Sequence, residues 1–229
     1  GCWHIPKDKT KRGRKTPLFL NDAFVLELLY KIWYNISRKS IRRKEISMKS
    51  VAMAFYNGAK YIDEQIRSIL DNMEETDELI ISVDDASDGS EAILEDWVQN
   101  DQRIRIIKGP GKGVVKNFEN AFKHCRGEII FLSDQDDVWK PDKIYLTLQK
   151  MEALEARYGE KTPILVHSDL SVADHNLEMV AESFFQYANI PKRIVLNQLM
   201  VQNSVTGCTM MINRCLQQYR SEERRVGKE

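Results

Sequence analysis

The chain has 229 residues, of which 42% are hydrophobic and 30% are charged, a composition typical of a soluble globular domain. The formal net charge is zero, but residues 1–49 carry 13 basic and 4 acidic side chains, so the remainder is acidic. No window reaches the roughly 18 uninterrupted apolar residues of a membrane span, and residues 1–16 lack the apolar core of a signal peptide. We therefore expect one main domain preceded by a basic arm, with no membrane span.

The cysteines match neither a disulfide framework nor a zinc site. No two of them form a CxxC pair, and none has a histidine at metal-ligand spacing. This usage favours a reducing cytosol, so a cytoplasmic location is expected. The four residues are Cys2, Cys125, Cys208 and Cys215.

From Ser50 onward, short apolar runs alternate with amphipathic segments. The first run ends at a turn dipeptide, Asn57 and Gly58, and the apolar positions after it recur with the period of a helix. The same alternation then repeats along the chain. It predicts strands at 50–56, 78–83 and 103–108, and helices whose apolar faces include 62–70 and 93–98.

The second half of this region continues the pattern after a glycine-rich break at 109–113. Pro141 fits the first turn of a helix, where its missing N–H is tolerated. Alternating strands and helices of this length predict βαβ units with right-handed crossovers and a mainly parallel sheet, as in the Rossmann-like α/β class. The expected elements are strands at 128–133 and 163–168, and helices with apolar faces over 114–122 and 144–151.

Polar residues follow four of the predicted strands at their carboxyl ends. In an open α/β sheet, this edge is where ligands bind, because the loops there converge on a crevice. A random scatter of surface carboxylates would not respect one edge. The residues are Tyr56 and Asn57, Asp84 and Asp85, the run from Asp134 to Asp137, and Ser168 and Asp169.

The three aspartates within residues 134–137 repel one another, so a cation, a raised pKa or full solvation must compensate. Asp134 and Asp136 form an Asp-x-Asp arrangement that can direct oxygens at one hard ion. Mg²⁺ or Mn²⁺ prefers such ligands, with substrate phosphates completing its shell. The alternative is a solvated acidic turn near a helix N-terminus, where aspartate is also favoured.

The acidic pair Asp84 and Asp85 is suited to accept hydrogen bonds from a nucleobase imide or a ribose hydroxyl. The glycine-rich segment 109–113 matches neither the GxxxxGK[ST] nor the GxGxxG phosphate motif. We therefore interpret it as a turn. A role for Lys112 or Lys116 in holding phosphate is the alternative.

The chain resembles glycosyltransferase family 2, which has the nucleotide-sugar-binding GT-A fold, and within that family it is similar to the rhamnosyltransferase-type members. The resemblance covers roughly residues 48–214. It rests on five stretches in a fixed order, which together are more specific than any one alone. They are VAMAFYNGAKYIDEQIRSIL, DELIISVDDASDGS, GVVKNFENAFKHCRGEIIFLSDQDDVWKPDKI, LVHSDLSVAD and NSVTGCTMMINR.

The resemblance implies a role for each matching polar residue. Two would shape the base pocket, two would bind the pyrimidine and ribose, and one would lie near the nucleotide. Two more would form the motif that binds metal and diphosphate, and a last pair would lie beside the donor sugar. In that order, these are Tyr56 and Asn57, Asp84 and Asp85, Asn117, Asp134 and Asp136, and Gln135 and Asp137.

The reaction implied by the resemblance transfers a sugar from a nucleoside diphosphate, dTDP- or UDP-linked, to an acceptor hydroxyl with inversion. Its cofactor would be Mg²⁺ or Mn²⁺, which neutralises charge on the departing diphosphate. The acceptor would be a saccharide or a lipid-linked saccharide of a cell-surface polysaccharide. No nucleic-acid partner is expected.

The two ends of the chain depart from the family pattern. A general base is expected downstream of the NSVTGCTMMINR stretch, but the chain after Arg220 reads SEERRVGKE and has no family likeness. We thus expect a family domain at 48–220 with an incomplete acceptor part, and an unrelated tail at 221–229. Asp169 is a substitute base that we consider but do not favour.

Residues 1–47 form an extension upstream of the expected domain. Phe24, Leu28, Ile32 and Trp33 lie among basic residues, a pattern typical of a helix on an anionic membrane surface. Peripheral contact with the inner face of the plasma membrane would suit a lipid-linked acceptor. A poorly packed appendage is the other interpretation.

Two further functions compete with this interpretation. The DQDDV run at 134–138 also satisfies the nucleophile motif of haloacid-dehalogenase-type phosphatases, although three βα units precede it here rather than none. The chain could instead be a fragment that binds the donor but cannot catalyse. Binding of a pyrimidine nucleoside diphosphate fits the fragment and the transferase, and hydrolysis of phosphate monoesters fits the phosphatase.

Overall fold

The computed structural model describes residues 48–174, 176–190 and 205–219, which belong to one compact unit. The expected basic helix around 24–33 and the tail at 221–229 lie outside the described residues. Within the described ranges, no helix is both long and apolar enough to cross a membrane.

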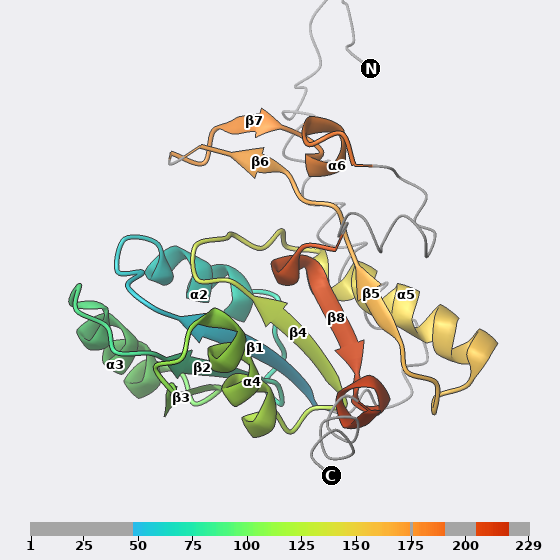
Figure 1. Ribbon diagram of the computed structural model, residues 1–229, viewed down its shortest axis with the longest axis horizontal. Coiled ribbons are helices and arrows are strands. Elements are labelled where there is room, and N and C mark those ends of the chain that lie inside the picture. Colours follow the sequence, from blue (N-terminus) through green and yellow to red (C-terminus); the bar gives the residue numbers. More distant parts are fainter. Residues whose placement is uncertain (1–47, 175, 191–204, 220–229) are drawn as a thin grey trace, which may run out of the picture. The chain divides into compact units, whose positions relative to one another are not determined.

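The centre of this unit is a six-stranded sheet with the order β3-β2-β1-β4-β8-β5. Parallel pairing joins β1 to both β2 and β4, and β2 to β3, so the predicted mainly parallel α/β sheet is confirmed (Figure 1). Five of the strands lie where the apolar runs predict them. The bounds are β1 Lys49–Phe55, β2 Glu78–Val83, β3 Ile104–Lys108, β4 Ile129–Ser133, β5 Leu165–His167 and β8 Met210–Asn213.

Within the main sheet, β8 is the strand that the periodicity did not predict. It lies between β4 and β5 and is antiparallel to both. A short 3-10 turn, η1 (Gly207–Thr209), leads directly into it. Because β8 runs opposite to β4, its first residues lie at the carboxyl edge of the parallel strands, beside the end of β4.

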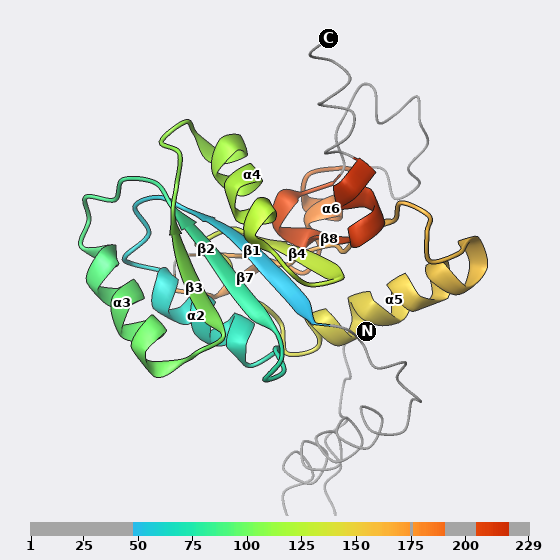
Figure 2. The same cartoon turned by 90° about the horizontal axis from the view of Figure 1, so that it is seen from below.

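Helices cover both faces of the sheet. Apolar residues of α2, α3 and α5 pack with Val51, Met53 and Phe55 of β1, whereas α4 packs against the opposite face, with Ala52. Figure 2 shows α4 on one side and the other three helices on the other. The bounds are α2 Ile62–Leu70, α3 Ser90–Asn100, α4 Val114–His124 and α5 Lys143–Tyr158.

Helix α5 begins at Lys143, so Pro141 lies in the turn before the helix and not in its first turn as predicted. A smaller element follows β5: a hairpin of β6 (Val172–Ala173) and β7 (Met179–Ala181), continued by α6 (Phe184–Tyr187). This hairpin forms a sheet separate from the main one.

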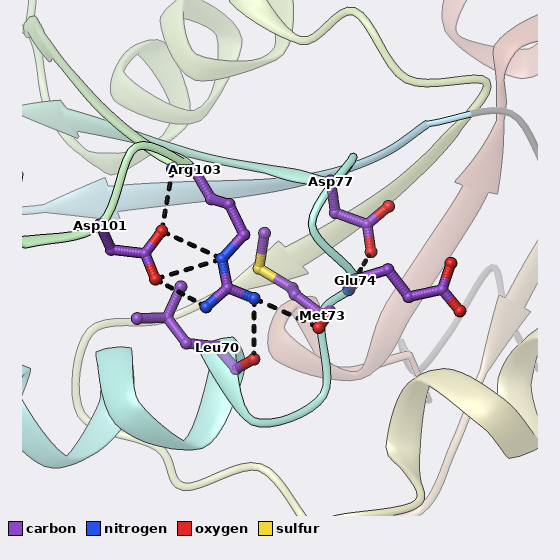
Figure 3. A network of polar contacts seen from close by, with 6 residues as sticks. All are labelled: Leu70, Met73, Glu74, Asp77, Asp101 and Arg103. Atoms are coloured by element: carbon purple, nitrogen blue, oxygen red, sulfur yellow. Dashed lines mark hydrogen bonds and ion pairs between the residues drawn. The ribbon is translucent and has the colours of Figure 1, made fainter. Parts of the chain in front are cut away.

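A partly buried polar network anchors the C-terminal end of α2 (Figure 3). The Nε and Nη2 atoms of Arg103 donate to the Asp101 carboxylate at 2.6 to 3.1 Å. Its Nη1 atom donates to the carbonyls of Leu70 and Met73, both at 3.2 Å. Leu70 is the last residue of α2, and the final carbonyls of a helix lack partners within the helix. The Leu70 carbonyl also accepts from the Met73 N–H at 3.1 Å, and Arg103 joins this turn to the start of β3.

We predict that Arg103→Met lowers the free energy of unfolding by about 2 kcal/mol, because the hydrogen bonds from a charged group to Asp101 and to the Leu70 and Met73 carbonyls are removed. The exposed pair of Arg67 and Asp63 provides the control. Its side chains are 65% and 58% exposed, so Arg67→Met should change the free energy by no more than about 0.5 kcal/mol. Urea denaturation of both variants measures the difference, and equal losses would contradict the anchoring role.

The pair of Arg103 and Asp101 makes the stability of the fold depend on pH. Hydrogen bonding from Arg103 outweighs burial and lowers the pKa of Asp101 below its ordinary value. A carboxyl whose pKa is depressed in the folded state stabilises above its unfolded pKa and loses that contribution as the pH falls through the folded one. The penalty of Arg103→Met should therefore be complete at neutral pH and shrink in acid.

Candidate functional site

The carboxyl ends of β1, β2 and β4 open onto a cleft of about 750 Å³. This is the edge at which the sequence places its polar residues. All the residues expected to bind nucleotide or metal, except Asn57 and Asp137, line it. The lining consists of Ala54, Phe55, Tyr56, Asp84, Asp85, Gly111, Gly113, Val114, Asn117, Asp134, Gln135 and Asp136.

Tyr56 follows β1, and its backbone is held by the side chain of Gln135. The Tyr56 N–H donates to Oε1 of Gln135 at 2.7 Å, and Nε2 of Gln135 donates to the Tyr56 carbonyl at 2.7 Å. The Tyr56 side chain itself is 57% exposed. The next residue, Asn57, is in the left-handed region with a φ of 47°, and its Oδ1 accepts from the Ser87 N–H at 2.8 Å. Asn57 thus joins two loops and does not line the cleft.

The two aspartates after β2 have different surroundings. Asp84 is buried, and its Oδ1 accepts from the Gly111 N–H at 2.7 Å. Asp85 is exposed and lines the cleft. The pair therefore consists of one buried carboxylate that holds the glycine loop (residues 109–113) and one exposed carboxylate that is open to a ligand.

The glycine loop packs too closely on Asp84 to carry a side chain at Gly109. An added Cβ there would lie 2.2 Å from Oδ1 of Asp84 and 2.8 Å from both the Asp84 backbone N and Oδ1 of Asn117. Gly111 and Gly113, by contrast, have φ values of 62° and 83°, which glycine adopts without steric penalty. Thus the glycines serve two needs, close approach and backbone conformation.

Helix α4 begins where the glycine loop ends, and its first turn borders the cleft. Gly113 caps the helix, and Val114 and Asn117 line the cleft with it. The Asn117 side chain is buried, and its Nδ2 donates to the Phe55 carbonyl at 3.1 Å. Neither Lys112 nor Lys116 belongs to the lining, and Lys116 pairs with Glu119 at 3.0 Å.

The loop after β4 (residues 134–137, the carboxylate loop) contains Asp134, Asp136 and Asp137, and the last two face different sides. Asp136 is exposed and lines the cleft. Asp137 points to the buried side, where ligand atoms of Asp134, Asp137 and Cys208 lie within 4.8 Å of one another. Oδ2 of Asp137 is buried, with no hydrogen-bond partner in the described structure.

Burial and neighbouring negative charge raise the pKa values of two groups in this cluster. Burial, reinforced by Asp137 and Asp136, raises the pKa of Asp134. Burial and Asp137 likewise raise the pKa of the Cys208 thiol, so the thiol stays protonated near neutral pH. The cluster therefore combines two acids and one neutral sulfur.

Lys143, in the first turn of α5, supplies a positive charge at the same place. Its Nζ donates to the Cys208 carbonyl at 2.7 Å and lies 4.3 Å from the centre of the Trp139 ring. Burial lowers its pKa, while Cys208, Asp137 and Asp134 act in the opposite direction. Lys140 makes a parallel contact, from its Nζ to Ser171 Oγ at 2.7 Å. The two lysines tie the segment after the carboxylate loop to η1 and to the residues before the hairpin.

Sequence reasoning did not identify Lys143 or Cys208 as part of the site. No known ligand-binding motif singles out Lys143, and Cys208 was considered only as a possible zinc ligand or disulfide partner. The one signal that would have placed them is the position of β8, since Cys208 comes two residues before it. Strand β8 has only four residues, and so short an apolar run does not reveal that the strand lies antiparallel between β4 and β5.

Asp169 does not have the surroundings of a general base. Its Oδ1 accepts from the N–H groups of Leu170 and Phe185, at 2.8 and 3.2 Å, and its Oδ2 accepts from Ser183 Oγ at 2.5 Å. Burial opposes ionisation, but these hydrogen bonds prevail and hold the pKa of Asp169 below its ordinary value. A carboxylate with a lowered pKa is a weaker base. Asp169 instead links the segment before the hairpin to the start of α6.

Comparison with known proteins identifies a family for most of the described chain. The model for glycosyl transferase family 2 matches residues 50–214. The glucosyltransferase WfgD of Escherichia coli, named for transfer from UDP-Glc to a GlcNAc-diphosphoundecaprenol, is 25% identical over 73% of this chain and 60% of its own length. The dTDP-rhamnosyl transferase RfbG of Shigella flexneri is 36% identical over 40% of this chain and 34% of its own.

A third relative is TuaG of Bacillus subtilis, a glycosyltransferase assigned provisionally by its name to teichuronic acid biosynthesis. It is 27% identical over 72% of this chain and 62% of its own length. The chain therefore spans at most 62% of these three relatives. Because the family match includes residues 134–138, the haloacid-dehalogenase interpretation of DQDDV is wrong.

Among solved structures, the fold is similar to that of Staphylococcus aureus TarS residues 1–349, determined in complex with UDP-GlcNAc. The TM-score is 0.51 at 21% sequence identity, over 76% of this chain and 47% of that chain. At this level of identity the similarity concerns the fold. It supports the GT-A type architecture expected from the sequence.

We predict that Gly109→Ala lowers the free energy of unfolding by about 2 kcal/mol, as overpacking of a filled site does. The added methyl group meets backbone and buried polar atoms that cannot move away cheaply. Gly207→Ala is the matched control, because an added Cβ there has no atom within 4 Å. Thermal and urea denaturation measure both variants. A Gly109→Ala protein as stable as Gly207→Ala would show that the glycine loop does not pack on Asp84 as described.

Proposed function

Because the chain belongs to glycosyltransferase family 2, we propose that its cleft binds a nucleoside diphosphate sugar and that the protein transfers the sugar to an acceptor hydroxyl. The observation that carries this proposal is the meeting of polar residues from three strand ends on one cleft. Tyr56 comes from β1, Asp85 from β2 and Asp136 from β4. Such an edge is where α/β sheets bind nucleotides.

In the proposed complex, the base lies on the side of the cleft made by the first two strand ends. The exposed Tyr56 side chain offers a flat surface to a pyrimidine, and the exposed Asp85 carboxylate accepts from its imide or from a ribose hydroxyl. The first turn of α4 presents unpaired N–H groups beside Asn117, a setting that favours negative charge. Asn57 and Asp84 support this region through the loops that they hold.

The carboxylate loop fits a divalent cation. Asp134 and Asp136 both line the cleft, and hard cations prefer oxygen ligands shared with substrate phosphates. The buried group of Asp134, Asp137 and Cys208 is the weaker alternative, because Lys143 already supplies a positive charge there. We therefore propose that Asp134 and Asp136 hold Mg²⁺ or Mn²⁺.

Transfer then proceeds as a single displacement with inversion. The acceptor oxygen forms a bond to the anomeric carbon while the bond from that carbon to the diphosphate oxygen breaks, and the acceptor proton passes to a general base. A bound cation stabilises the charge that develops on the diphosphate. The protein's own contribution is to orient the donor through Asp85 and Asn117 and to position the carboxylates of Asp134 and Asp136.

The proposal extends to the class of donor and acceptor. The donor is a dTDP- or UDP-sugar, since an acidic residue at the end of β2 suits a pyrimidine imide. WfgD is named for a diphosphoundecaprenol-linked acceptor and RfbG for rhamnosyl transfer from dTDP; these names support a saccharide or lipid-linked acceptor in surface polysaccharide assembly at the inner face of the membrane. A protein that binds donor without transferring sugar remains the alternative.

Calorimetry with UDP and dTDP, with and without Mn²⁺, tests the donor site. We expect binding to the wild-type protein to be at least tenfold tighter with the cation, and we expect Asp136→Ala to abolish that difference. Asp96→Ala removes an exposed carboxylate on α3 and should leave it intact. No binding by the wild-type protein, or binding indifferent to metal, would count against the proposal.

A second variant separates the two possible ligand sets. If Asp134 and Asp136 bind the cation, Asp137→Ala should retain most of the metal dependence. Loss of metal dependence in Asp137→Ala together with its retention in Asp136→Ala would instead assign the ion to the buried group with Cys208. Sugar transfer from the donor to an added acceptor, followed by mass spectrometry, then distinguishes the transferase from the donor-binding protein.

A further inference from the structure

We propose that Gln135 is a positioning residue of the nucleotide site: its side-chain amide holds Tyr56 in the orientation that receives the base, and so couples the base side of the cleft to the carboxylate loop. The inference rests on the proposed function, and it changes the expected role of Gln135. The resemblance to the family implies a place beside the donor sugar. The hydrogen bonds of the side chain point to Tyr56 instead.

The two hydrogen bonds between Gln135 and Tyr56 resemble one further step of the pairing between β4 and β1. The parallel register between β1 and β4 ends at the pair Met53 and Ser133, so no backbone ladder reaches Tyr56. At Tyr56 the Gln135 side chain replaces the backbone partner. Its Oε1 accepts from the Tyr56 N–H and its Nε2 donates to the Tyr56 carbonyl, both at 2.7 Å. A primary amide has the same donor and acceptor pattern as a peptide group, and it prolongs the pairing of the two strands beyond their ends.

Gly58 provides the space for this side chain. A Cβ at residue 58 would lie 3.1 Å from both Cδ and Nε2 of Gln135, and 2.9 Å from Cε2 of Phe55. Gln135 is therefore packed as well as hydrogen-bonded, because its amide lies close against the turn that follows β1. The fit limits where the amide can move.

Two other contacts hold the same turn from a different loop. The Asn57 side chain accepts from the Ser87 N–H at 2.8 Å, and the Ala59 N–H donates to Oδ2 of Asp88 at 2.7 Å. Both partners belong to the loop after β2. Gln135 is the link from this turn to the carboxylate loop, 79 positions away in the sequence.

This arrangement makes the two halves of the cleft interdependent. Gln135 lies between Asp134 and Asp136 in the chain, so a shift of the carboxylate loop on binding diphosphate is passed to Tyr56. Conversely, a base packed on Tyr56 restrains the carboxylate loop. Thermodynamic linkage requires that such an effect act equally in both directions.

The decisive measurement is the affinity of Gln135→Ala for UDP and dTDP, which carry no sugar, in the presence of Mn²⁺. We expect a loss of about tenfold, as for the removal of two hydrogen bonds that fix a binding residue, and the same loss for UDP-GlcNAc. Gln149→Ala removes a glutamine on α5 whose amide contacts only the Tyr145 hydroxyl among the described residues, and should bind as the wild type does. Unchanged affinity of Gln135→Ala for the sugar-free nucleotides, with loss only for UDP-GlcNAc, would overturn the inference and restore a contact with the sugar.

A double variant tests whether Gln135 acts through Tyr56. If it does, Tyr56→Ala and Gln135→Ala should weaken UDP binding by less in combination than the product of their separate effects, because both remove the same contribution. Multiplicative effects would show that Gln135 acts independently of Tyr56 and would contradict the proposal.

A measurement without ligand keeps the inference separate from the proposed function. The Tyr56 amide proton should exchange faster with solvent in Gln135→Ala than in the wild type, and at the wild-type rate in Gln149→Ala. Equal exchange in all three proteins would show that the amide does not hold Tyr56. If exchange changes as expected but the wild-type protein binds no nucleoside diphosphate, the proposed function fails and the contact between Gln135 and Tyr56 stands.

Discussion

The parallel pairing of β1 with β4 is the constraint on which the candidate site depends. Both strands are almost entirely buried, and their register aligns Lys49 with Ile129 and Met53 with Ser133. Since parallel strands point the same way, their carboxyl ends meet at one edge of the sheet, and residues 79 positions apart become neighbours. The burial of alternate side chains on two faces fixes this register, because a shift by one residue would exchange the two faces. The hydrophobic core therefore determines the geometry of the cleft.

The acidic residues after β4 have a positive neighbour that the sequence did not reveal. The sequence predicts a divalent cation at Asp134 and Asp136, and the structure adds Lys143 near the buried acids. Burial raises the pKa of Asp134 and lowers that of Lys143, so both charges are disfavoured singly and favoured as neighbours. Lys143 therefore offsets part of the negative charge on the buried side of the loop. Asp134 and Asp136, which both line the cleft, remain the carboxylates available to a ligand.

The sequence predicted five strands of the main sheet, its four flanking helices and the edge at which polar residues gather, because buried strands and amphipathic helices have clear periods. It did not predict the small hairpin of β6 and β7 or helix α6. It did not predict β8, since a run of four residues carries too little pattern and the order of strands in a sheet is not local information. Nor could it predict which atoms of Asp84, Gln135 and Lys143 would pair with distant backbone groups. Those contacts depend on the paths of three loops, which follow from the assembled sheet.

The two acidic motifs share one division of roles. After β2, Asp84 binds the N–H of Gly111 while its neighbour Asp85 is exposed to the cleft. After β4, Gln135 binds the backbone of Tyr56 while its neighbour Asp136 is exposed to the cleft. In both motifs, one of two adjacent side chains holds a neighbouring loop and the other is exposed at the cleft. The residue that fixes the loop is thus next to the residue that the loop presents to a ligand.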